Sequence, residues 1–106
     1  MEISVVDAKA KLDRGDPVHL IDVREQAEVT ICRIEGAEHI PMMELFTATT
    51  PTIAARDAEI IVYCHTGVRS MEATMYLRHQ GFTNVASLAG GIHEWAKKID
   101  PTLATY

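Results

Sequence analysis

Short apolar runs alternate with helical patterns along the chain, and this alternation constrains the fold more than any other feature of the sequence. The predicted strands lie at residues 17–23, 38–41, 59–64 and 84–88. Helical patterns separate and follow them at residues 24–34, 42–48, 68–82 and 90–99. Strands that alternate with helices form βαβ units. The sequence therefore predicts the α/β class, with a small parallel β-sheet that carries helices on both faces.

A further helix is expected near the N-terminus, before Gly15. Ser4 is suited to its N-cap, and Asp7 follows three residues later, as in an acidic variant of the capping box. Apolar residues are expected along the buried side of this helix: Val6, Ala10 and Leu12.

The size and charge of the chain limit its function. At 106 residues it is expected to form one domain, residues 1–106, with any site at an edge of the fold. A net charge of −5 argues against nucleic-acid binding, which depends on cationic side chains. No apolar run reaches the roughly 20 residues of a membrane helix, and the first residues are too polar for a signal peptide. We therefore expect a soluble cytoplasmic protein without nucleic-acid or membrane partners, whose two cysteines remain thiols.

Cys64 ends the clearest predicted strand, and Gly67 lies just before a predicted helix. Parallel sheets place functional sites at the carboxyl ends of their strands. We expect the free N–H groups of residues 65–69, the helix dipole and Arg69 to stabilise the nucleophilic thiolate of Cys64. Gly67 permits a tight turn, and Arg69 and Ser70 can bind an anionic substrate. A cysteine after an apolar strand is usually a buried small side chain, but the spacing C-x-x-G-x-R-S favours a reactive one.

This segment resembles the active-site loop of rhodanese-like sulfurtransferases, in which a cysteine opens a six-residue loop and carries sulfane sulfur as a persulfide. The corresponding loop here consists of Cys64, His65, Thr66, Gly67, Val68 and Arg69. The resemblance implies that Cys64 is the catalytic nucleophile and that His65 to Ser70 bind the substrate. It implies no metal and no organic cofactor.

Three other segments resemble the same family in the same order. Two follow one another near the N-terminus, a D-x-R-E stretch and an I-x-G-A-x-x-I-P stretch, with the matching residues Asp22, Arg24, Glu25, Glu28, Ile34, Gly36, Ala37, Ile40 and Pro41. The third is the L-x-G-G-x-x-x-W pattern formed by Leu88, Gly90, Gly91 and Trp95. Residues 95–106 resemble the ends of rhodanese modules that are fused to adenylyltransferases. The chain departs from the commonest pattern at Cys32 and Arg33, where many members have Gly-His.

Several residues outside the loop are interpreted as structural and not catalytic. Asp22, Arg24 and Glu28 are interpreted as an ion-pair and hydrogen-bond set that fixes the loop after a strand. Cys32 is expected to be a packed thiol and Trp95 a core residue, while Gly90 and Gly91 let the last helix start close to the active-site loop. Scattered single histidines do not have the spacing of metal ligands: His39, His79 and His93.

The resemblance implies a sulfurtransferase that moves sulfur from a small anionic donor such as thiosulfate to cyanide, a small thiol or a protein thiol. A protein donor is also compatible with an exposed site. Phosphatases and arsenate reductases of related fold rank second, because a seven-residue C-x5-R loop holds their tetrahedral group and the loop here is one residue shorter. A non-catalytic rhodanese-like binding module is the third alternative, although such modules commonly lack the cysteine.

Overall fold

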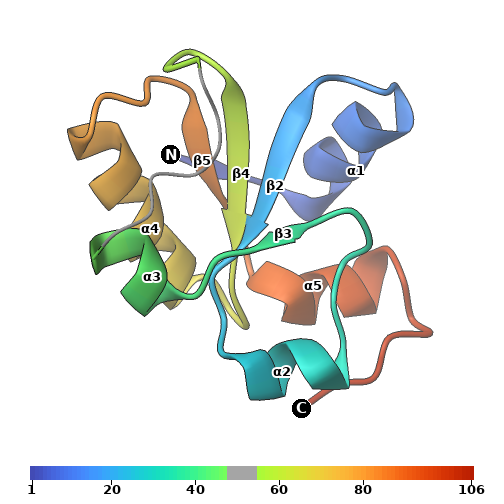
Figure 1. Ribbon diagram of the computed structural model, residues 1–106. Helices are drawn as coiled ribbons and strands as arrows, with labels where there is room; N and C mark the ends of the chain where they lie inside the picture. The colour runs from blue at the N-terminus through green and yellow to red at the C-terminus, as the bar shows by residue number, and fades with distance from the viewer. Residues whose placement is uncertain (48–54) are drawn as a thin grey trace.

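The computed structural model describes residues 1–47 and 55–106, which contain a five-stranded parallel sheet (Figure 1). The strands are β1 (Glu2–Ile3), β2 (Val18–Asp22), β3 (Glu38–His39), β4 (Glu59–Tyr63) and β5 (Val85–Leu88). Their order across the sheet is β1-β5-β4-β2-β3. Every neighbouring pair is parallel, so β4 lies at the centre, with its carboxyl end beside the carboxyl ends of β2 and β5.

Five helices connect and cover the strands: α1 (Val5–Asp13), α2 (Gln26–Ile31), α3 (Met42–Thr47), α4 (Val68–His79) and α5 (Gly91–Lys98). The helices α3 and α4 lie on one side of the sheet, and α1 and α5 lie on the other (Figure 1). The short helix α2 follows β2 and lies at the carboxyl edge of the sheet, near the C-terminus of the chain. This arrangement confirms the predicted α/β class and the helices on both faces.

The alternating side chains of β4 supply both halves of the core. Ile60 and Val62 pack with α3 and α4, and Ile61 and Tyr63 pack with α1 and α5. All four side chains are almost completely buried. A central strand that is apolar on both faces is what a covered parallel sheet requires. The apolar run therefore fixes β4 in the middle of the fold and delivers the next residue, Cys64, to its carboxyl edge.

The structure corrects two details of the sequence analysis. It contains an additional short edge strand, β1, which pairs with the carboxyl half of β5 and was not predicted. In α1 the buried residues are Val5 and Ala8, whereas Val6 is 59% exposed. Positions 5, 8 and 12 form one helical stripe, so the prediction was right for Leu12, which packs against the core, and wrong for Val6 and Ala10, which are exposed. The predicted N-cap is confirmed, because the Asp7 N–H donates to Ser4 Oγ at 3.0 Å.

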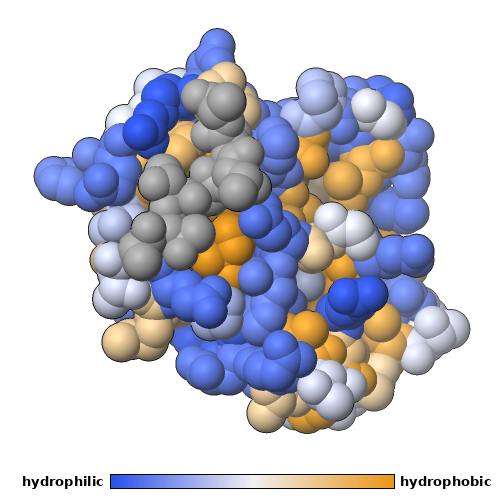
Figure 2. All heavy atoms as spheres, viewed as in Figure 1, coloured by the Kyte–Doolittle hydropathy of each residue, from blue (hydrophilic) through white to orange (hydrophobic). Residues whose placement is uncertain are grey.

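The remaining boundaries agree with prediction to within a few residues. Residue 48, predicted to belong to α3, and the expected end of that helix at residues 49–52 lie outside the described residues. The surface seen in Figure 2 is mostly hydrophilic, with hydrophobic residues in small groups between the elements. Among the described residues, none of the helices is long and apolar enough to cross a membrane.

Candidate active site

Cys64 lies directly after β4, and its side chain is 1% exposed. The loop that follows turns at Gly67, whose φ of 113° is left-handed, and α4 begins at the next residue. Gly67 is the N-cap of α4 and therefore supplies no capping side chain. The N–H groups at this helix start are left for other acceptors, and for two of them, those of Gly67 and Ser70, the acceptor is the sulfur of Cys64.

Two backbone N–H groups converge on Cys64 Sγ. The Gly67 N–H donates to the sulfur at 3.1 Å, and the Ser70 N–H donates at 3.3 Å. Both groups lie at the N-terminus of α4, which carries the positive end of the helix dipole. These donors favour the thiolate, because an anionic sulfur accepts stronger hydrogen bonds than a neutral thiol. Of the predicted donors, the N–H groups of residues 65–69, Gly67 is confirmed, and the second donor, Ser70, lies one residue beyond that range.

A hydroxyl pair lies beneath the sulfur. Ser70 Oγ is 3.4 Å from Cys64 Sγ and 2.7 Å from Ser87 Oγ of β5, and both serines are completely buried. Ser70 Oγ also lies 3.2 Å from the Gly67 carbonyl oxygen. When Ser87 donates to Ser70, the single Ser70 proton is free to turn toward either the sulfur or this carbonyl. Ser70 is therefore placed to stabilise the sulfur from within the core.

The last helix is attached to the backbone of the same loop. The Ile92 N–H donates to the Cys64 carbonyl at 2.9 Å, and the His93 N–H donates to the His65 carbonyl at 3.0 Å. Gly91 makes this close approach possible, since a Cβ added there would lie 2.6 Å from the Cys64 carbonyl oxygen. The expected role, to let α5 start close to the loop, is confirmed for Gly91, whereas a Cβ at Gly90 would meet the Glu94 side chain of the same helix.

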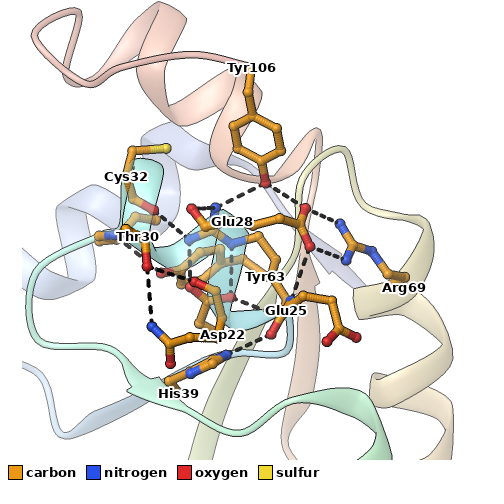
Figure 3. Close-up of polar contacts among 12 residues, drawn as sticks. Asp22, Glu25, Glu28, Thr30, Cys32, His39, Tyr63, Arg69 and Tyr106 are labelled. Atoms are coloured by element: carbon orange, nitrogen blue, oxygen red, sulfur yellow. Dashed lines mark hydrogen bonds and ion pairs between the residues drawn. The ribbon is translucent and has the colours of Figure 1, made fainter.

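Arg69 reaches back across the site to Glu28 of α2 (Figure 3). Its two terminal nitrogens donate to the two carboxylate oxygens at 2.6 and 2.8 Å, a bidentate ion pair. Arg69 lowers the pKa of Glu28 to about 2, and Glu28 in turn raises the pKa of Arg69. This pair joins positions 41 residues apart and was not predicted.

The interpretation of Asp22, Arg24 and Glu28 as a structural ion-pair set is confirmed for Asp22 and Arg24, whereas the carboxylate of Glu28 pairs with Arg69. Arg24 is completely buried, and its Nε and Nη2 donate to the two carboxylate oxygens of Asp22 at 2.9 and 2.7 Å. Arg24 Nη2 also donates to the Cys32 carbonyl at 2.7 Å, which fixes the chain after α2. Burial works to lower the pKa of Arg24, but its hydrogen bonds to Asp22 and Tyr106 outweigh that effect and raise it.

Tyr106 closes the network from the C-terminus. Its hydroxyl accepts from Arg24 Nη1 at 3.0 Å and donates to Glu28 Oε2 at 2.8 Å (Figure 3). Its ring stacks on the ring of His65, with centroids 4.0 Å apart and an interplanar angle of 15°. Burial is the main reason that the pKa of Tyr106 is raised. One face of His65 is therefore covered by the end of the chain.

Among the predicted loop residues, Gly67 and Ser70 contact the sulfur, His65 stacks on Tyr106 and Arg69 pairs with Glu28, while two others are in solvent. Thr66 is exposed, and Val68 is 69% exposed. Cys32 and Trp95 are buried core residues, as predicted. Within the described ranges, 1–47 and 55–106, no group of His, Cys, Asp and Glu residues could hold a metal ion.

Sequence reasoning missed Ser87 and Tyr106. A serine inside the apolar run at 84–88 is a weak signal for a buried hydroxyl that needs a partner. The position of Tyr106 at the end of the chain carries no such local signal, because its partners lie in α2 and in the active-site loop.

Comparison with known proteins assigns the fold and site to a family. The profile of the Rhodanese-like domain matches residues 4–98. The probable adenylyltransferase/sulfurtransferase MoeZ of Mycobacterium tuberculosis is 38% identical over 90% of this chain, which spans only 24% of that protein. A sulfurtransferase of Allochromatium vinosum is 34% identical, and the match covers 97% of this chain and 94% of the relative.

A solved structure agrees with these sequence matches. The human single-domain sulfurtransferase TSTD1 superposes with a TM-score of 0.79 at 28% identity, covering 92% of this chain and 96% of that one. The chain thus belongs to the rhodanese-like domain family, and it is related over nearly its whole length to small sulfurtransferases.

Proposed function

We propose that this protein transfers sulfane sulfur from a donor such as thiosulfate to a thiophilic acceptor, through a persulfide on Cys64. The observation that carries the proposal is the convergence of two N–H groups and the Ser70 hydroxyl on one buried cysteine sulfur at the carboxyl edge of the sheet. Membership of the rhodanese-like family supports it.

In the first half-reaction the Cys64 thiolate attacks the outer sulfur of thiosulfate. A new S–S bond forms to Cys64 Sγ, the original S–S bond breaks, and its electron pair leaves with sulfite. In the second half-reaction an acceptor such as cyanide attacks the outer sulfur of the persulfide. Thiocyanate leaves, and the Cys64 thiolate is restored. Two displacements at one sulfur give ping-pong kinetics.

The loop residues take distinct roles in this proposal. The N–H groups of Gly67 and Ser70 stabilise the thiolate and, after loading, the inner sulfur of the persulfide. The remaining loop residues form the donor site: His65, Thr66, Gly67, Val68, Ser70 and Arg69, which binds an anionic donor only to the extent that its pair with Glu28 opens. Because Thr66 and Val68 are exposed, the site is also open to a small thiol or to a cysteine of a protein acceptor. No metal or organic cofactor takes part in either step.

Mass spectrometry after incubation with thiosulfate tests the proposal. The wild-type protein should gain the mass of one sulfur on Cys64 and lose it when cyanide is added. Cys64→Ser should abolish this gain, while Cys32→Ser, which changes a packed thiol in the core, should retain it. No gain in the wild-type protein with any sulfane donor, or equal loss in both variants, would contradict a single Cys64 nucleophile.

A further inference from the structure

We propose that Glu28 is a specificity-determining positioning residue: it holds Arg69 in a neutral pair, so that Cys64 takes sulfur from a thiol-bound donor, an alkyl persulfide, in preference to an oxyanion such as thiosulfate. This inference rests on the proposed sulfur-transfer function and names the class of donor. It concerns Tyr106 as well, because Tyr106 anchors Glu28.

The first step is the charge of Arg69. Both of its terminal nitrogens are used by the Glu28 carboxylate, at 2.6 and 2.8 Å. Arg69 lies in the first turn of α4, next to Ser70, whose N–H donates to Cys64 Sγ. An approaching dianion therefore meets an ion pair with no net charge where the sequence alone indicated a free cation. The field of such a pair decreases faster with distance than the field of a single charge.

The second step is that Glu28 is fixed in place. In addition to Arg69, its carboxylate accepts from the Glu25 N–H at 3.0 Å and from the Tyr106 hydroxyl at 2.8 Å. Tyr106 is itself held by Arg24 Nη1 and by its stack on His65. Only 19% of the Glu28 side chain is exposed, so salt screens the pair weakly. Glu28 therefore stays in place when a donor approaches, and the donor has to compete with it for both terminal nitrogens of Arg69.

The third step is that Arg24, the other arginine of this network, does not supply a free positive charge in place of Arg69. The guanidinium of Arg24 is completely buried and paired with Asp22 at 2.7 Å. The protein as a whole carries a net charge of −5, which opposes the approach of a dianion. Attraction of thiosulfate is therefore weak, although the loop N–H groups donate hydrogen bonds to the sulfur of Cys64.

A protonated alkyl persulfide, R–S–S–H, does not need a cationic pocket. The Cys64 thiolate attacks its outer sulfur, a new S–S bond forms to Sγ, and the bond between the two donor sulfurs breaks. The electron pair leaves with the inner sulfur as the thiolate R–S⁻, and Cys64 becomes the persulfide Cys64–S–S–H. Charge is conserved, because one thiolate is consumed and one is released. Such a donor can be a small molecule or a cysteine on another protein.

The test compares single-turnover loading of Cys64 by thiosulfate and by 2-hydroxyethyl persulfide, followed by rapid quenching and mass spectrometry. In Glu28→Gln the half-saturating concentration of thiosulfate should fall about fivefold, the gain from one released charge, while the maximal loading rate stays within about twofold. Loading by 2-hydroxyethyl persulfide should change by less than about twofold. Tyr106→Phe, which keeps the stack on His65 but loses the hydroxyl, should shift thiosulfate loading in the same direction by a smaller factor.

Two controls separate this role from a structural or general charge effect. Glu35→Gln removes one exposed carboxylate elsewhere on the chain and should leave both donors unaffected. In an Arg69→Gln background, Glu28→Gln should have little further effect on thiosulfate if it acts through Arg69.

Three results would overturn the inference. The first is an unchanged or higher half-saturating concentration of thiosulfate in both Glu28→Gln and Tyr106→Phe. The others are an equal improvement in loading by both donors in Glu28→Gln, or the same improvement with thiosulfate when Glu28→Gln is made in the Arg69→Gln background. Absence of loading by either donor in the wild-type protein would instead reject the proposed function.

Discussion

The N–H of Ile92 donates to the carbonyl of Cys64 at 2.9 Å, so the N-terminus of α5 is bonded to the residue that bears the proposed nucleophile. The preceding residue, Gly91, has a φ of 62° and packs directly on this carbonyl. The position of the active-site loop therefore depends on the absence of a side chain at one point of another helix.

Gly91→Ala is expected to destabilise the protein and to displace the loop. The added Cβ would meet backbone atoms of Cys64 and His65, which cannot rotate away as a side chain could. We expect a loss of roughly 2–3 kcal/mol in the free energy of unfolding, measured by urea denaturation, and slower sulfur loading of the folded fraction.

Gly36→Ala is the matched control. Gly36 also has a positive φ, 88°, but a Cβ there would meet nothing within 4 Å. Its cost should be limited to backbone strain of about 1 kcal/mol, with normal loading. If the two variants lost equal stability and kept equal activity, the close approach at Gly91 would not matter for the site.

Acid should weaken the fold partly through Glu28. Its pKa in the folded protein is about 2, chiefly because of Arg69, and lies below the ordinary value of 4.5. The unfolded chain therefore binds the proton more readily, and the stabilisation is complete above about pH 4.5 and lost as pH falls toward 2. In Glu28→Gln, the decrease in unfolding free energy between pH 5 and 2.5 should be smaller than in the wild type.

Arg69→Gln supplies the partner control, because it removes the main cause of the shift while it keeps the carboxylate. It should reduce the same pH dependence. Unfolding curves recorded at several pH values measure both effects. A wild-type acid dependence in both variants would show that the pair adds no stability over this range.

Local features of the sequence were enough to predict the central part of the fold. Residues 60–63, before Cys64, are all apolar or aromatic, so both faces of a strand formed by them are apolar. A strand in the middle of a parallel sheet buries both of these faces. In α1, by contrast, apolar residues occur on several sides of a short helix. Packing against α5 then decides that Val5, and not Val6, is buried.

The site could be predicted where it is built from consecutive residues and not where it is built from distant ones. The convergence of the Gly67 N–H on Cys64 follows from a strand, a tight turn and a helix start in a row. The pair between Glu28 and Arg69 and the stack of Tyr106 on His65 each join residues about 41 positions apart. No local periodicity determines which charged side chain a distant arginine will meet.

Phosphatase activity should be negligible. The loop from Cys64 to Arg69 is one residue shorter than the C-x5-R loop of phosphatases, and its arginine is engaged by Glu28 through both terminal nitrogens. A phosphoryl group would therefore lack both space and its main cationic ligand. The wild-type protein should not hydrolyse an aryl phosphate measurably under conditions in which it loads sulfur. Robust hydrolysis, lost in Cys64→Ser, would reverse the ranking of the two activities.

The hydroxyl pair beneath the sulfur should control the reactivity of Cys64. Ser70→Ala removes the Oγ that lies 3.4 Å from Sγ but keeps the Ser70 N–H, so the thiolate loses a hydroxyl that can turn toward it and keeps both N–H donors. We expect alkylation of Cys64 by iodoacetamide at neutral pH to slow by about tenfold, since a hydrogen bond to a charged group contributes about 1.5 kcal/mol or more.

Ser87→Ala should slow the same reaction less, because Ser87 contacts the sulfur only through Ser70. The ranking of the two variants is the informative result, since both delete one buried hydroxyl and leave a similar void. Equal slowing would mean that the core around β5, and not the hydroxyl at the sulfur, sets the reactivity. No slowing in Ser70→Ala would mean that the N–H groups of Gly67 and Ser70 alone support the thiolate.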